Sequence, residues 1–373
     1  MEKNLLPFIF LLSSPSLLHG NLALTSGTND GSENNGDMLK FDQKLTCFGG
    51  FIKVHTELKI HPSHGQYYYG SKDHSGVGFG NFIEMGPLDG HLKPKNFTWL
   101  KKADLLFVDS PVGVGFSYVE DKKLLVKTDE EAASDLTILL KELFNENETL
   151  QRSPLFIFGE SYGGRFAVTL GVSALRVIEA GELKIQLGAV ALGDSWISPE
   201  DFVFTWAPFL KDVSRMDNNG LIKSNRLALR IKHQLAEGKY ENATTSWIAL
   251  ENVIFRPSTY VDVYNFLHDL GNDLIIDGMT SKEFKGLGLD VICSTKGAEA
   301  WVQKLKLDGL EEFFSLKRFP LYCGNDESIT KGFVTSYKNL FFHWILGSGH
   351  FVPAEQPCVS LQMVGNITRS PNY

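Results

Sequence analysis

The chain has 373 residues, 43% of them hydrophobic and 21% charged, which is typical of a globular protein with a full core and not of a disordered chain. Acidic side chains outnumber basic ones by 44 to 36, for a formal net charge of -8. This balance argues against a nucleic-acid partner, because such proteins normally carry a basic face. The four cysteines lack the close spacing of zinc-finger or thioredoxin motifs, which excludes both: Cys47, Cys293, Cys323 and Cys358.

The first 24 residues have the pattern of a signal peptide. Met1-Glu2-Lys3-Asn4 precedes an apolar run at about 5–18 that prolines and serines interrupt. No later stretch reaches the roughly 18 to 20 apolar residues of a membrane span, so no membrane anchor is expected. The sequence therefore predicts a polar spacer at 25–46, a single domain at 47–373, and a secreted, vacuolar or lysosomal destination.

Two further features fit the secretory pathway. Asn-x-Ser/Thr sequons predict glycosylation at Asn96, Asn147, Asn242 and Asn366. In an oxidising compartment one or two disulfides are expected. Cys323 with Cys358 is one candidate pair, and the sequence leaves the connectivity open.

From about residue 99 the chain alternates apolar strands with helical patterns, which indicates a parallel sheet with crossover helices. Strands are predicted at 105–108, 155–158 and 187–192, and a helix at about 165–180 that stops at Gly181. Thr128 and Glu131 have the spacing of a capping box and predict that another helix begins there.

Residues 218–286 change character, with several helical patterns and no strong strand. This region is predicted to be a helical cap inserted into the core. Apolar segments typical of the core occur again at 287–290 and at 340–346.

The predicted strand at 155–158 runs directly into Gly159-Glu160-Ser161-Tyr162-Gly163, and a helix follows. This is G-x-S-x-G in the strand–turn–helix context of a nucleophilic serine. The glycines matter because a sharp turn brings strand and helix too close for a Cβ atom. Ser161 is therefore the candidate nucleophile.

A serine nucleophile needs a base, and in this architecture the chain order is Ser, Asp, His. Of the ten histidines, His350 lies in a glycine-rich loop after an apolar strand, downstream of Ser161. The orienting acid is less defined by pattern. Asp290 lies between the two in order, and Asp273 and Asp277 compete with it.

Several segments together resemble the serine carboxypeptidase family, and within it the retinoid-inducible branch and the plant serine carboxypeptidase-like proteins. The match spans about 75–367, in segments 80–82, 86–89, 108–118, 159–165, 191–199 and 349–353. The resemblance implies an α/β-hydrolase fold in which Ser161 is the nucleophile, Asp290 the orienting acid and His350 the base.

The resemblance also implies substrate-binding roles for Glu84, Glu160 and Tyr162. In the family, glutamates at the first two positions help to bind the terminal carboxylate of the substrate, and the N–H of Tyr162 would be an oxyanion donor. Two neighbouring carboxyls cannot both ionise cheaply, so activity at mildly acidic pH is implied. Glu84 could instead be an ordinary surface residue.

The chain departs from the family at two places, which predicts an α/β-hydrolase lacking two core strands. Before Ser75 there is no strand ending in Trp-x-x-Gly-Gly-Pro-Gly, the loop that gives the family a second oxyanion donor. Between about 277 and 287 a longer cap and another strand are missing. Losing one oxyanion donor costs roughly 10²–10³ in turnover, so weak activity is expected.

The function predicted from these features is a serine-type carboxypeptidase that releases C-terminal residues from peptides through an acyl-enzyme. Its partners would be peptides or proteins with a free C-terminus, and the resemblance implies no metal and no cofactor. Two alternatives stay open: an acyltransferase that uses glucose esters with the same triad, and an inactive isoform. The presence of Glu84 and Glu160 favours the peptidase, and the sequence does not indicate an oligomeric state.

Overall fold

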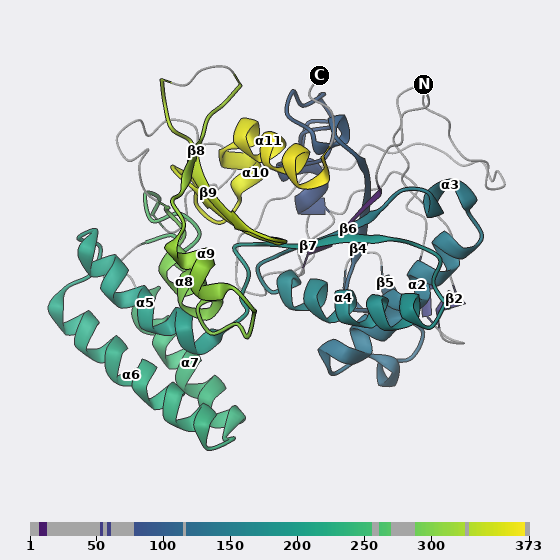
Figure 1. Ribbon diagram of the computed structural model, residues 1–373. Coiled ribbons are helices and arrows are strands. Elements are labelled where there is room, and N and C mark those ends of the chain that lie inside the picture. The colour runs from purple at the N-terminus through teal and green to yellow at the C-terminus, as the bar shows by residue number, and fades with distance from the viewer. Residues whose placement is uncertain are drawn as a thin grey trace. The chain divides into compact units, whose positions relative to one another are not determined.

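The computed structural model divides into two compact units (Figure 1): Met1–Leu192 with Ile367–Tyr373, called here the first unit, and Gly193–Asn366, the second unit. The structure describes residues 7–12, 53–54, 58–60, 78–114, 117–255, 261–269, 288–324 and 328–369. Among the helices of these described ranges, none is both long enough and apolar enough to cross a membrane.

The first unit is built on a four-stranded sheet in the order β4-β1-β6-β7. The strands are β1 (Pro7–Leu12), β4 (Asp104–Asp109), β6 (Leu155–Glu160) and β7 (Leu187–Gly193). β1 pairs in parallel with both β4 and β6. The three strands predicted from apolar runs after residue 99 are therefore confirmed and lie in one sheet.

The interior place between β4 and β6 is taken by β1, which lies within the predicted signal peptide. The sequence predicts that a core strand is missing, yet this sheet has no gap at that place. β1 fills it with main-chain pairing along the whole length of the strand, from Pro7 beside Asp104 to Leu12 beside Asp109. The signal peptide itself stays a prediction.

Helices α2 (Asp129–Asn145), α3 (Glu148–Gln151) and α4 (Gly163–Glu179) complete the main part of the first unit. The capping box before α2 is confirmed. The Thr128 hydroxyl accepts the Glu131 N–H at 3.1 Å, and the Glu131 carboxylate accepts the Thr128 N–H at 3.2 Å. α4 ends as predicted at Gly181, whose φ of +72° suits a residue without a side chain.

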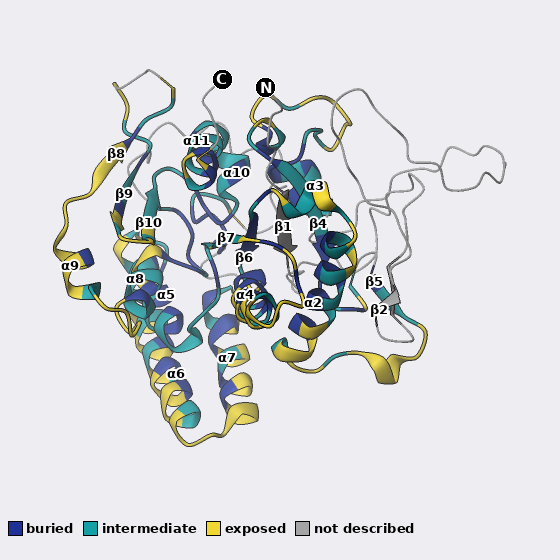
Figure 2. Ribbon diagram, turned by 45° about the vertical axis from the view of Figure 1, so that its right-hand side comes forward, coloured by how far each residue is buried: buried dark blue, intermediate teal, exposed yellow. Residues whose placement is uncertain are grey.

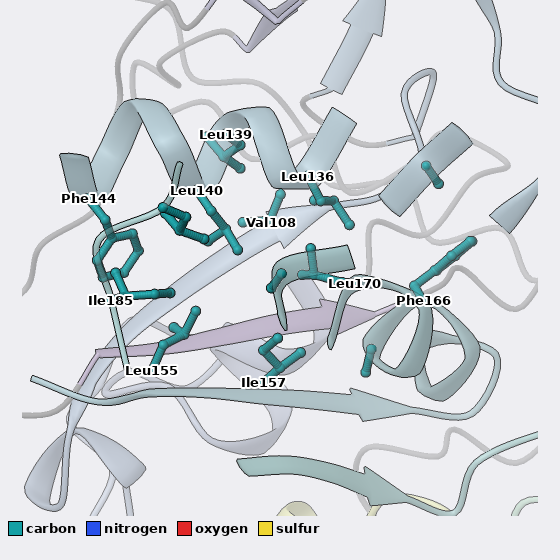
Figure 3. Packing of buried hydrophobic residues seen from close by; sticks show 14 of the residues in the cluster. Val108, Leu136, Leu139, Leu140, Phe144, Leu155, Ile157, Phe166, Leu170 and Ile185 are labelled. Carbon is teal, nitrogen blue, oxygen red and sulfur yellow. The ribbon is translucent and has the colours of Figure 1, made fainter. Parts of the chain in front are cut away.

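α2 and α4 pack against β4 and β6 through a cluster of buried aliphatic and aromatic side chains (Figure 3). Leu140, Leu155, Ile157 and Leu170 are fully buried in it. Burying one such side chain stabilises the fold by about 1.5–3 kcal/mol. This core fixes the strand and the helix on either side of Ser161.

Smaller elements surround this core. An antiparallel sheet has the order β2-β3-β5, with β2 (Lys53–Val54), β3 (Leu58–Ile60) and β5 (Ser117–Val119). A π-helical turn spans Phe79–Glu84, and short 3₁₀ turns span Trp99–Lys101 and Lys122–Leu124.

The second unit begins with three helices, α5 (Pro199–Asp212), α6 (Asn218–Ala236) and α7 (Tyr240–Ile254). Each buries one face and exposes the other (Figure 2), and Trp206, Ile231 and Leu250 meet in a common core. α6 and α7 agree with the helical patterns read from 218 onward. Within 261–269 there is no helix, and 256–260 and 270–287 lie outside the described residues, so the extent of the cap stays a prediction.

The second unit continues with α8 (Thr295–Val302), α9 (Leu310–Ser315), α10 (Val352–Glu355) and α11, which begins in this unit and spans Pro357–Thr368. An antiparallel sheet has the order β10-β9-β8, with β8 (Phe319–Leu321), β9 (Gly332–Tyr337) and β10 (Leu340–Ile345). The apolar run at 340–346 thus forms a strand, in a sheet separate from that of the first unit.

A disulfide joins Cys323 to Cys358, the candidate pair named from the sequence. It ties the loop after β8 to the start of α11 across a separation of 35 residues. Cys293 is a buried free thiol, and Cys47 lies outside the described residues.

Candidate active site

Ser161 lies in the turn between β6 and α4, where the sequence places the nucleophile. Its φ is +54°, in the left-handed region that costs a non-glycine residue about 1–3 kcal/mol and is concentrated at functional sites. A Cβ atom on Gly159 would lie 2.3 Å from the carbonyl oxygen of Gly163. Strand and helix therefore approach as closely as the glycine pattern predicts, and Ser161 is held at a strained corner.

Tyr162 is the residue at which α4 begins, and α2 holds its side chain. Its hydroxyl donates to Asp129 Oδ1 at 3.1 Å, and Arg165 forms an ion pair with Asp129 Oδ2 at 2.8 Å. Burial raises the pKa of the Tyr162 phenol; the Arg165 charge opposes this shift and Asp129 adds to it. The phenol stays protonated and bonded to α2, which fixes the backbone next to Ser161. The first N–H groups of a helix have no intrahelical acceptor, so this end of α4 suits a developing oxyanion.

Glu160 and Glu84 both belong to the first unit. Glu160 is the last residue of β6 and is half-buried, next to Ser161. Glu84 ends the π-helical turn and is 1% exposed, so the alternative interpretation of Glu84 as a surface residue is wrong. A buried carboxyl group needs a structural or chemical reason.

Lys95 lies beside Glu84 and is partly buried. Its ammonium donates to the carbonyl oxygens of Ile83, at 2.9 Å, and of Glu84 itself. Burial lowers the pKa of Lys95 to about 8, and the negative charge of Glu84 opposes that shift. Lys95 therefore fixes the backbone that carries Glu84, a contact that the sequence analysis missed.

Asp290 and His350 are brought together in the second unit. Asp290 Oδ2 lies 2.8 Å from His350 Nδ1, and the two residues are 5% and 2% exposed. The other oxygen, Oδ1, accepts the N–H of Cys293 at 3.1 Å. A proton on Nδ1 shared with a carboxylate leaves Nε2 with its lone pair, which is the tautomer that a general base needs.

The contact with His350 supports Asp290 as the orienting acid, while its competitors Asp273 and Asp277 lie outside the described residues. Asp290 is not in a regular strand. Its segment is held by main-chain hydrogen bonds on both sides, from Leu289 N–H to the Ser348 oxygen at 2.8 Å and from Val291 N–H to the Val263 oxygen at 2.9 Å. Asp290 is thus positioned by hydrogen bonds of irregular backbone and not by a strand.

His350 is held by residues that the sequence analysis did not identify. Its N–H donates to the carbonyl oxygen of Tyr264 at 2.7 Å. The rings of Tyr264 and Phe351 lie 5.0 and 5.3 Å from the imidazole, centroid to centroid. Tyr264 belongs to 261–269, in the region predicted to be a helical cap. No local pattern joins residues so far apart in sequence, so no signal could have found this contact.

Asp290, Cys293 and His350 also form a group of potential metal ligands, with one donor atom from each lying within 4.8 Å of the others. Because Asp290 and His350 already share a hydrogen bond, we interpret this group as the acid–base pair. The expected absence of metal and cofactor stays a prediction.

The four sequons differ in exposure. Asn96, Asn242 and Asn366 are exposed. Asn147 is half-buried, and its side-chain oxygen accepts the N–H groups of Thr149 and Leu150 at the start of α3. Glycosylation of all four stays a prediction.

Comparison with relatives shows that this chain lacks internal segments. It is 48% identical to Serine carboxypeptidase-like 51 of Arabidopsis thaliana over 383 aligned positions, which cover 80% of this chain and 83% of the relative. Because 80% of 373 residues is about 298, about 85 of the 383 positions hold a residue in the relative and none here. This count agrees with an internal segment missing from this chain, and the two places at which the sequence departs from the family stay predictions.

Other comparisons agree on family and fold. Retinoid-inducible serine carboxypeptidase of Rattus norvegicus is 36% identical over 370 positions, covering 79% of this chain and 82% of the relative. Kex1(delta)p, a prohormone-processing carboxypeptidase from Saccharomyces cerevisiae, matches with a TM-score of 0.64 at 18% identity over 79% and 80% of the chains. Its α/β-hydrolase fold is the fold of this chain. Residues 74–270 and 226–370 match the serine carboxypeptidase family model. The chain belongs to the serine carboxypeptidase family and is a hydrolase of that class.

Proposed function

We propose that this chain is a serine carboxypeptidase in which Ser161, His350 and Asp290 act together as a triad on peptides with a free C-terminus. The observation that carries the proposal is the buried hydrogen bond between His350 Nδ1 and Asp290 Oδ2, at 2.8 Å. A buried imidazole paired with a carboxylate on one nitrogen is poised to accept a proton on the other. The strained φ of Ser161 supports its role as nucleophile.

In the proposed reaction, Ser161 Oγ attacks the last peptide carbonyl while His350 Nε2 takes its proton. The C–N bond then breaks, and His350 returns the proton to the leaving amine of the C-terminal residue. A water molecule, deprotonated by His350, releases the rest of the peptide from Ser161 in the reverse sequence. Asp290 keeps the imidazole in one tautomer and stabilises the imidazolium, and the N–H of Tyr162 stabilises the oxyanion.

Glu84 and Glu160 are proposed to bind the terminal carboxylate of the substrate. Burial disfavours the ionised form of a carboxyl group, and a neutral carboxyl can donate a hydrogen bond to a carboxylate. The burial of Glu84 supports this role. It also favours binding at mildly acidic pH, at which such a group keeps its proton.

We further propose that the chain is exported, to the extracellular space or to a vacuole or lysosome. Its disulfide, Cys323 with Cys358, supports this, because disulfides persist in oxidising compartments. The four Asn-x-Ser/Thr sequons fit the same route.

The test uses the full-length protein and a fluorophosphonate probe, which reacts with activated serines. We expect stoichiometric labelling of Ser161 and none in a folded Ser161→Ala variant. Two substrates are then compared, a peptide with a free C-terminus and the same peptide amidated. Release of the C-terminal residue from the free form alone supports the carboxypeptidase.

Other outcomes overturn the proposal in distinguishable ways. A folded protein without labelling would be an inactive member of the family. Labelling with transfer of an acyl group from a glucose ester to an alcohol, and no peptide cleavage, would make the chain an acyltransferase. Because the sequence lacks the loop that gives the family a second oxyanion donor, we expect turnover lower by roughly 10²–10³ than in a complete site, so product is measured over long incubations.

A further inference from the structure

We propose that Asn265 and Glu355 form a clamp that positions His350 for proton transfer; the inference rests on the proposed function of His350 as the base. Neither residue touches the reacting atoms. They act through the loop that carries the imidazole, and are therefore positioning residues.

The clamp closes on Gly349, the residue before His350. Glu355 is the last residue of α10, and its Oε2 accepts the N–H of Gly349 at 3.0 Å and the side-chain N–H of Asn265 at 2.7 Å. The next N–H along the chain, that of His350, donates to the carbonyl oxygen of Tyr264 at 2.7 Å. The N–H of Gly349 is thus held by the Glu355 carboxyl group, and the N–H of His350 by the Tyr264 carbonyl oxygen. Asn265, the neighbour of Tyr264, donates to the same carboxyl group.

The segment 261–269 also holds the other member of the acid–base pair. The carbonyl oxygen of Val263 accepts the N–H groups of Val291 and Ile292, and Phe266 N–H donates to the Leu289 oxygen at 3.1 Å. One turn therefore bonds to the backbone on both sides of Asp290 and to the loop of His350. This arrangement sets the position of the carboxylate and the imidazole relative to one another.

The packing around Gly349 leaves no room for a side chain at this position of the loop. A Cβ atom at this position would lie 2.1 Å from the Tyr264 oxygen and 2.8 Å from the Asn265 Cβ. Asn265 is 3% exposed, and its side-chain oxygen accepts the Leu267 N–H at 3.1 Å, so both ends of its amide are occupied. Because a general base must be placed to within about 0.5 Å, loosening this clamp should act on proton transfer.

The protonation state of Glu355 predicts which substitution the hydrogen bonds at this position should tolerate. Burial raises the pKa of Glu355 to about 7, Asp290 and Asp262 add to the shift, and the hydrogen bonds from Gly349 and Asn265 oppose it. Below that pH the group is mostly neutral. Both accepted hydrogen bonds go to Oε2, so the proton can reside on Oε1. A glutamine has the same shape and one acceptor oxygen, and should replace the neutral glutamic acid closely.

The experiment compares Glu355→Ala, Glu355→Gln and Asn265→Ala with the parent protein at mildly acidic pH. A matched control is Glu299→Ala, which removes a carboxylate that accepts the Trp344 indole N–H at 2.7 Å elsewhere in the second unit. Two quantities are measured: kcat and KM for a peptide with a free C-terminus, and the low-field proton resonance of His350 Nδ1–H, which needs no turnover.

We expect Glu355→Ala and Asn265→Ala to lower kcat by about 10- to 100-fold with little change in KM, and to broaden or remove the resonance. Glu355→Gln should stay within about threefold of the parent and keep the resonance, and Glu299→Ala should alter neither readout. If Glu355→Ala does not fold, Asn265→Ala, which removes only one of the bonds, carries the test.

An unchanged kcat and resonance in the alanine variants would overturn the clamp. So would a Glu355→Gln variant as impaired as Glu355→Ala, because the hydrogen-bonding role would then be wrong. If the parent protein shows no turnover, the proposed function fails, while the resonance still decides whether the clamp orders His350.

Discussion

The two halves of the proposed triad are built in different ways. Ser161 lies in the first unit at a turn between a regular strand and a regular helix, all within 155–179. Asp290 and His350 lie in the second unit, 60 residues apart, on backbone outside regular strands. The nucleophile turn is therefore encoded locally, whereas the acid–base pair depends on hydrogen bonds between distant segments. The second half should be easier to disturb without unfolding the protein.

The largest effect is expected from removing the N-terminal strand β1. This deletion tests whether the turn that carries Ser161 depends only on residues near it in sequence. β1 pairs with both β4 and β6; without it these strands would lie about 10 Å apart with their facing backbone groups unbonded. A chain starting at Thr25 should lose its cooperative thermal unfolding, measured by circular dichroism, and its labelling at Ser161.

The control is a shorter deletion that ends before Pro7 and spares β1, which should unfold like the full chain. Unchanged unfolding of the chain that starts at Thr25 would show that β1 does not support the sheet. That result would favour removal of this segment as a signal peptide.

The acid–base pair is tested next by Asp290→Asn. An asparagine can keep the geometry but favours the wrong imidazole tautomer, so kcat should fall by about 10⁴-fold while the unfolding temperature changes little. The matched control is Asp201→Asn, since Asp201 accepts hydrogen bonds from the Ser198 hydroxyl, at 2.6 Å, and from Lys304 but is not the partner of His350. An equal fall in kcat in both variants, measured by steady-state kinetics, would contradict the assignment of Asp290.

A smaller effect concerns the pH dependence of stability in the second unit. Burial raises the pKa of Glu251, in α7, to about 7 from its ordinary 4.5. Between these values the folded state keeps a proton that the unfolded chain releases. This contribution to the free energy of unfolding is therefore full below about pH 4.5 and is lost as pH rises through 7, by up to a few kcal/mol.

Glu251→Gln should flatten that pH dependence, measured by urea unfolding at several pH values. His343, whose pKa burial lowers to about 4, acts in the opposite direction. Its contribution is lost as pH falls from about 6.5 through 4. A Glu251→Gln variant with the slope of the parent protein would contradict the first assignment.

The smallest effect is expected at the capping box of α2. Thr128→Ala removes the acceptor of the Glu131 N–H and should lower the free energy of unfolding by about 0.5–2 kcal/mol. Thr128→Ser keeps the hydroxyl and should cost little. A loss of equal size in both variants, measured by urea unfolding, would assign the effect to the methyl group instead of the cap.

Much of the first unit could be predicted because its signals are local. The strand before Ser161, the capping box at Thr128 and the stop at Gly181 each depend on residues within a few positions of one another. The burial of Glu84 and the Lys95 contact beneath it could not be predicted, because they depend on packing between segments.

In the second unit, His350 could be placed in order along the chain, but the sequence left three aspartates as its possible partner. Asp290 bonds to His350 in the structure, and the other two lie outside the described residues. The helical patterns of α6 and α7 were readable from the sequence. The turn at 261–269 was not, since its main-chain hydrogen bonds carry no sequence pattern.

The sequence by itself determined the family, the strand–turn–helix around Ser161 and the order of the proposed triad residues, because glycine spacing and apolar periodicity act over short stretches of backbone. The tertiary structure alone decided three things: that Asp290 bonds His350, that Cys323 pairs with Cys358, and that Asn265 and Glu355 close on Gly349. Apart from the bond between Gly349 and Glu355, these contacts join residues 35 to 90 positions apart. Such contacts form only when burial brings the segments together, and no short stretch of sequence encodes that meeting.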